Sequence, residues 1–174
     1  MQNPPQSTVK KQNTANPPRS RFWQIFWLSF LVFSLAYAWY SFYVPANQVD
    51  WSADYATAQQ KSVQTGKPMI LFFTGKWCVP CRIMKREIWA NPDVTQHVNQ
   101  NFVPVQIDVN NEDSEEIMNG YKIKGAPVMI VTDANGNVLG WRAGKIQKQE
   151  FMNLLKSAVS LRSEEKLLPS HASH

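Results

Sequence analysis

One stretch carries both cysteines of this 174-residue chain: PMILFFTGKWCVPC, residues 68–81. Residues 69–74 form a short continuous apolar run, which is typical of a buried central strand. Residues 82–88, after the cysteines, predict a helix. A Cys-x-x-Cys pair at a strand-to-helix turn allows one sulfur to act as a nucleophile while the second displaces its product. The pair Cys78 and Cys81 therefore indicates thiol–disulfide chemistry.

The region after Pro45 has the pattern of one small globular domain. Its hydrophobic periodicity and turn residues predict helices over 51–64, 82–88, 93–100, 114–119 and 148–161, and strands over 69–74, 102–109, 128–132 and 138–141. Asn135-Gly136 suits the turn of a hairpin between the last two strands. The inward positions expected in the first and last of these helices are Tyr55, Ala58, Val63, Phe151, Leu154, Leu155 and Val159. This order predicts an α/β fold with a mixed central sheet and helices on both faces.

Two motifs together resemble the thioredoxin superfamily. They are Trp77-Cys78-Val79-Pro80-Cys81 after a buried strand and Gly125-Ala126-Pro127 before the hairpin. The similarity covers roughly residues 48–160, and Thr65-Gly66-Lys67-Pro68 looks like the exported members. The resemblance implies a three-layer thioredoxin-like sandwich, a cis-proline at Pro127 packed beside the cysteines, and a redox-active disulfide between Cys78 and Cys81.

The chain departs from the family pattern at three places. The family commonly places a buried Asp five residues before the motif Trp, and Phe72 stands there. The residue after the cis-proline is often Thr, and here it is Val128. The dipeptide between the cysteines is Val79-Pro80 rather than Gly-Pro. These three departures leave the redox potential of the cysteine pair undetermined. They do not change the expected fold.

The position of Cys78 at the first turn of a helix assigns the catalytic roles. Unpaired backbone N–H groups and the helix dipole favour a thiolate there, and Lys76 would add a positive charge. We expect Cys78 to attack a substrate disulfide and the more buried Cys81 to resolve the mixed disulfide. Pro80 removes an N–H where the loss costs little. The expected substrate-binding residues are Trp77, which would cover one side of the site, and Val79, Pro80, Ala126 and Pro127.

Other uses of the cysteines are less consistent with the sequence. A structural disulfide gains most by closing a long loop, and a two-residue spacer closes almost none. Zinc needs four ligands, and only His97, His171 and His174 would add nitrogen; copper handling with Met84 remains an alternative. We therefore predict no metal and no cofactor. The charged runs 85–87 and 108–116 are expected to be solvated surfaces.

The N-terminal part has a different character. Residues 1–21 carry four basic residues and no acidic one, and their composition predicts a disordered tail. Residues 22–44 contain no charge and are long enough to span a membrane. The basic flank predicts a cytoplasmic N-terminus and an exported domain, in a single-pass protein of the cytoplasmic membrane. Ala36-Tyr37-Ala38 leaves open a signal peptide cleaved after Ala38. The expected domain covers 45–162, with a flexible tail over 163–174.

The functional prediction is a thiol–disulfide oxidoreductase that reduces disulfides of exported proteins, with a membrane electron donor as a possible partner. The alternatives are a disulfide oxidase or isomerase, or a chaperone or copper metallochaperone without turnover. After residue 44 the chain has 14 basic and 13 acidic residues, so no basic face indicates nucleic-acid binding.

Overall fold

The structure is a computed structural model that describes residues 21–167. The chain divides into two compact units, Met1–Tyr43 and Val44–His174, and each is described by itself. The predicted disorder of the first 20 residues and the looseness of residues 168–174 lie outside the described residues.

The described part of the first unit is the helix α1 (Arg21–Phe42). It is 22 residues long, which corresponds to roughly 33 Å at 1.5 Å per residue. It is the one helix in residues 21–167 that is long and apolar enough to cross a membrane. A signal sequence near the N-terminus has the same length and composition, so α1 is consistent with either an anchor or a signal.

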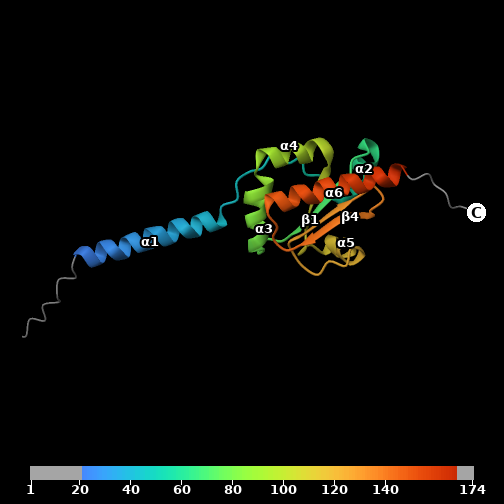
Figure 1. The fold of residues 1–174 in the computed structure, drawn as a ribbon. Helices are drawn as coiled ribbons and strands as arrows, with labels where there is room; N and C mark the ends of the chain where they lie inside the picture. Colours follow the sequence, from blue (N-terminus) through green and yellow to red (C-terminus); the bar gives the residue numbers. More distant parts are fainter. Residues whose placement is uncertain (1–20, 168–174) are drawn as a thin grey trace, which may run out of the picture. The chain divides into compact units, whose positions relative to one another are not determined.

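The second unit contains one four-stranded sheet with helices around it (Figure 1). Its elements in chain order are α2 (Tyr55–Thr65), β1 (Met69–Thr74), α3 (Val79–Met84), the π-helical turn η1 (Lys85–Trp89), α4 (Pro92–Asn101), β2 (Val103–Asp108), the 3-10 turn η2 (Glu112–Ser114), α5 (Glu115–Gly120), β3 (Val128–Thr132), β4 (Val138–Ala143) and α6 (Lys148–Leu167).

The sheet has the strand order β2-β1-β3-β4. β1 pairs in parallel with β2 and antiparallel with β3, and β3 forms the antiparallel hairpin with β4. The mixed sheet expected from the sequence is therefore confirmed, and β1 is one of its two central strands. All six residues of β1 are buried.

Alternate residues of β1 enter two separate cores, because successive side chains of a strand point to opposite faces. Ile70 and Phe72 pack in a cluster with residues of α3, η1, α4 and α6. Met69, Leu71 and Phe73 pack in the other cluster, with Ala58 of α2 and the half-buried side chains of α5. A sheet with a core on each face is the expected three-layer sandwich.

Two helices differ from the sequence prediction at their ends. α2 begins at Tyr55 rather than Trp51, because the side chain of Asp54 accepts a hydrogen bond from the Thr57 backbone N–H at 2.7 Å and caps the helix. Residues before the cap pair with the sheet instead, through the Ser52 backbone N–H and the Pro104 carbonyl. α6 continues to Leu167, beyond the expected end at Leu161 and into the segment expected to be a flexible tail.

Most of the expected inward residues are confirmed, but two valines are not. Val63 is 66% exposed and Val159 is 43% exposed. The buried positions next to them are Ser62, whose hydroxyl donates a hydrogen bond to the Lys67 carbonyl, and Ala158. In each helix only the last expected position is therefore wrong, and the neighbouring residue is buried in its place.

Phe72 is part of an aromatic cluster centred on Trp89. Its ring centroid is 5.4 Å from that of Trp89 and 6.4 Å from that of Trp51, and Trp89 also contacts Phe151 of α6 at 5.0 Å. Phe72 and Trp89 are fully buried. The cluster joins β1, η1 and α6, so it anchors the helix that begins at the cysteines.

We predict that Phe72→Ala lowers the free energy of unfolding by about 3–5 kcal/mol, since it removes a fully buried ring from this cluster. The matched control is Val63→Ala, which changes an exposed helical side chain and should stay within about 0.5 kcal/mol of the parent. Denaturant unfolding of the unit that follows Tyr43 measures both. Equal effects for the two variants would show that the cluster does not hold the sandwich together.

Candidate active site

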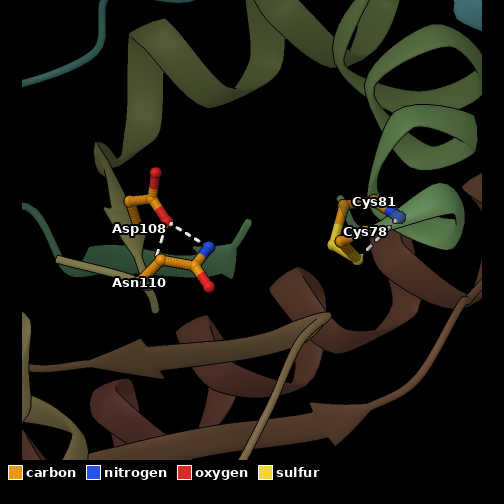
Figure 2. The surroundings of a disulfide bond; sticks show 4 residues. All are labelled: Cys78, Cys81, Asp108 and Asn110. Carbon is orange, nitrogen blue, oxygen red and sulfur yellow. Dashed lines mark hydrogen bonds between the residues drawn. A yellow bond between two sulfur atoms is a disulfide. The ribbon is translucent and has the colours of Figure 1, made fainter. Parts of the chain in front are cut away.

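The two cysteines are joined in a disulfide at the start of α3 (Figure 2), with their Cα atoms 5.2 Å apart. Cys78 is the N-cap residue of the helix, and its sulfur accepts a hydrogen bond from the Cys81 backbone N–H at 3.2 Å. Cys78 is half-buried, whereas Cys81 is 1% exposed. The pair is thus asymmetric, with one sulfur at the surface and the other in the core.

This geometry makes Cys78 the sulfur suited to attack a disulfide. Once the pair is reduced, the unpaired N–H groups of the first turn stabilise a thiolate at the N-cap. Pro80 occupies the first turn, where a missing N–H removes no helical hydrogen bond. Cys81 is already within bonding distance of Cys78, so it is placed to displace a partner from that sulfur.

Pro127 follows a cis peptide bond from Ala126, as the resemblance implied. Pro127 is buried, and its carbonyl accepts a hydrogen bond from the Gly144 backbone N–H at 2.8 Å, which ties the residues before β3 to the end of β4. Ala126 and Cys78 pack against the same core cluster. The cis-proline loop and the disulfide are therefore supported by one set of buried side chains.

The remaining predicted substrate-binding residues lie at the surface around the disulfide. The Trp77 side chain is 86% exposed, so it covers little of the disulfide and is open to a partner. Val79 is 49% exposed, and Pro80 is half-buried. Lys76 is exposed as well. The face around Cys78 is thus accessible and combines apolar side chains with one lysine.

The buried face beside Cys81 contains no acid at the position where the family commonly has one. Phe72 fills that position and lies among aromatic rings. The nearest polar side chain along β1 on the same face is Thr74, two residues further on. Thr74 is 2% exposed, and its hydroxyl has no hydrogen-bond partner within residues 21–167. No local pattern singles out Thr74, because its burial depends on packing from distant elements.

Lys85 and Asp108, which were both expected on solvated surfaces, interact electrostatically, and Asp108 lies in the surroundings of the disulfide. Lys85 of η1 is half-buried; burial lowers the pKa of its ammonium group, and the attraction of Asp108 opposes that effect. The pKa of Asp108 is lowered, chiefly by the hydrogen bond from the Asn110 backbone N–H and further by the charges of Lys76 and Lys85. Figure 2 shows Asp108 and Asn110 in the surroundings of the disulfide.

Gly75 lets the loop before the cysteines approach this pair. A Cβ at Gly75 would lie 2.8 Å from the Asn110 side-chain nitrogen, which itself donates to Asp108 at 2.9 Å. The Gly75 carbonyl also accepts a hydrogen bond from the Cys78 backbone N–H at 3.1 Å. The absence of a side chain at Gly75 thus lets the loop that leads to Cys78 pack closely against Asn110.

Within the described residues, no group of three His, Cys, Asp or Glu side chains is arranged to hold a metal ion. What the site contains is a disulfide, a helix start and a cis-proline. These parts are suited to exchange of disulfide bonds.

Comparison with known proteins agrees with this chemistry. The family model of the thioredoxin-like domain matches residues 55–158. The disulfide bond reductase DsbH of Chlamydia pneumoniae is 28% identical over 132 residues, which cover 68% of this chain and 78% of that protein. The thioredoxin-like protein HCF164 of Oryza sativa is 27% identical over 114 residues, but the match covers 66% of this chain and only 41% of the rice protein.

A solved structure of DsbH oxidoreductase has 28% sequence identity and a TM-score of 0.54, and the match covers 68% of this chain and 88% of that one. The family match includes β1, the Cys78–Cys81 helix and the cis-proline loop. The chain belongs to the thioredoxin-like domain family and is a thiol–disulfide oxidoreductase with a Cys-x-x-Cys active-site disulfide.

Proposed function

We propose that this protein reduces disulfide bonds of exported proteins while α1 holds it at the membrane. The observation that carries the proposal is the asymmetric pair: Cys78 half-exposed at a helix start and Cys81 buried one turn on. The name of the Chlamydia relative, a disulfide bond reductase, favours reduction over oxidation or isomerisation.

The reaction balances as two successive exchanges. The Cys78 thiolate attacks one sulfur of the substrate disulfide, forms a mixed disulfide and releases the other substrate sulfur as a thiolate. The Cys81 thiolate then attacks the Cys78 sulfur and releases the second substrate sulfur. Two electrons pass from the dithiol to the substrate, and solvent supplies the protons. The product is the Cys78–Cys81 disulfide, so each cycle needs a dithiol donor at the membrane to reduce it again.

The structure around the pair supports contact with a protein rather than a small molecule. Trp77 and Val79 flank Cys78 in the sequence, and both have exposed apolar side chains. The cis-proline loop lies against the same core cluster as Cys78. An extended segment of substrate would lie between these surfaces with its disulfide at the Cys78 sulfur.

The proposed location rests on α1. Its apolar length matches a bilayer, and the residues before it are basic, so the positive-inside rule supports an exported position for the residues that follow it. A disulfide reductant on that side acts where protein disulfides form.

We predict that Cys81→Ser accumulates mixed disulfides with substrate proteins in cells, because the thiol that releases them is gone. Cys78→Ser is the matched control and should accumulate none, since the attacking sulfur is missing. Non-reducing electrophoresis of acid-quenched cells, probed for this chain, measures the adducts. A chaperone or metallochaperone without turnover would give no adducts in either variant.

We predict that the full chain stays in the membrane with α1 attached. After alkaline carbonate washing of membranes, the protein should remain in the pellet, and its mass should include the residues before Trp39. A soluble product that begins at Trp39 would show cleavage after Ala38 and would contradict the anchor.

A further inference from the structure

A cavity of about 400 Å³ lies beside the cis-proline loop and is distinct from the disulfide itself. We call it the Trp141 pocket. It lies between the residues that precede β3 and the end of the edge strand β4. Its lining consists of Lys122, Ile123, Lys124, Gly125, Ala126, Pro127, Val128, Trp141, Ala143 and Gly144.

The charge of the Trp141 pocket is entirely positive. Its lining includes two lysines, Lys122 and Lys124, and no acidic residue. Both lysines are exposed, and within the described part of the chain neither forms a salt bridge. Nearby cations are paired, since Arg142 lies 3.4 Å from Glu150 and Lys145 lies 3.3 Å from Glu87. The two ammonium groups at the pocket are therefore available to meet an anion.

The backbone at Lys122 is held in an unusual conformation. Its φ is +55°, and it is the one described residue other than glycine with a positive φ. This position follows the end of α5, where glycine or asparagine is usually found. A lysine there costs on the order of 1 kcal/mol relative to glycine. Residues held in sparsely populated backbone conformations cluster at active sites and ligand clamps.

Apart from the two lysines, the side chains that line the pocket are apolar. Trp141 lies on the edge strand β4, where it pairs with Ile130 of β3. The Trp141 side chain is 48% exposed. Val128 and Ala143 continue the apolar lining toward Pro127. A half-exposed indole beside two ammonium groups suits a ligand with an apolar or aromatic side chain next to carboxylates.

A second cavity on the domain has the opposite charge. It is about 590 Å³ in volume and is lined by Asp54, Asp113 and Glu116 together with Tyr55 and Tyr121. The lysines of the Trp141 pocket are therefore not part of a uniformly basic surface. The positive charge is placed at the end of the sheet that carries the cis-proline loop.

We propose that the Trp141 pocket selects substrates in which an acidic segment with an apolar side chain flanks the disulfide. The inference rests on the proposed function, because it names the substrate class of that same site. Ala126 and Pro127 belong both to the pocket and to the loop expected to hold the substrate. A substrate segment held at this loop would therefore also meet the pocket.

The test compares two cyclic peptides, each closed by one disulfide, that differ only in the flank: Glu-Phe-Glu in one and Lys-Phe-Lys in the other. The full chain, reduced and held in a neutral detergent, reduces each peptide at about 10 mM salt, where charges act over roughly 30 Å. We expect the acidic peptide to react roughly tenfold faster, and the difference to shrink in about 0.5 M salt.

Charge-reversed variants assign the effect to the pocket. Lys122→Glu/Lys124→Glu should abolish or reverse the preference, whereas Lys156→Glu, an exposed lysine of α6, should keep it. All three proteins should reduce the uncharged probe bis(2-hydroxyethyl) disulfide at the parent rate, which shows that the variants are folded and active.

The outcomes separate the two claims. If the neutral disulfide is reduced through Cys78 but the two peptides react equally fast, the pocket does not select acidic segments and the proposed function stands. The same conclusion follows if Lys156→Glu changes the preference as much as the double variant. If no probe is reduced, the proposed function fails and this inference fails with it.

Discussion

The burial of β1 on both faces is the constraint on which the rest of the domain depends. The six residues of β1 are fully enclosed by β2, β3 and two helical layers, so the end of the strand is fixed in space. Burial of this kind contributes roughly 25 cal/mol for each square ångström of apolar surface, and β1 takes part in both cores. The loop that leaves β1 delivers Cys78 to the start of α3, and the Phe72–Trp89 contact holds the far end of the same helical segment. A rigid strand end thus positions the reacting sulfur.

The site differs from the usual family pattern because no carboxyl group at position 72 can accept a proton near the buried Cys81. An aromatic ring at Phe72 replaces the carboxyl group that would lie near the buried cysteine. A charge there would be costly among Trp51, Trp89 and Phe151, so this core is incompatible with an acid at that position. The stabilisation of a Cys78 thiolate then depends on the helix start. Basic side chains are placed near it, and Lys85 is balanced by Asp108 rather than by a group in the core.

The sequence predicted the parts of this molecule that are governed by local pattern. The strand over the apolar run 69–74, the cysteine helix and the hairpin after β3 depend on a few neighbouring residues, and all are present. The cis bond before Pro127 followed from the family resemblance. What failed depends on contacts between distant elements. In α2 and α6 the buried residues near the end of the stripe are Ser62 and Ala158 rather than Val63 and Val159. Lys85 is half-buried rather than exposed, since it is covered by elements distant in the sequence, which a local pattern does not reveal. The Trp141 pocket joins residues 122–128 to residues 141–144, so no single segment indicates it.

The reduction potential of the Cys78–Cys81 pair tests the central claim most directly. The full chain is equilibrated against glutathione buffers of known ratio, and the fraction of the oxidised pair is measured by thiol alkylation and mass. For a reductant we expect one two-electron couple with a potential near or below about −230 mV, in the range of thioredoxin and the glutaredoxins. A potential above about −180 mV, toward that of isomerases and strong oxidants, would contradict the assignment as a reductant and indicate disulfide formation or reshuffling instead.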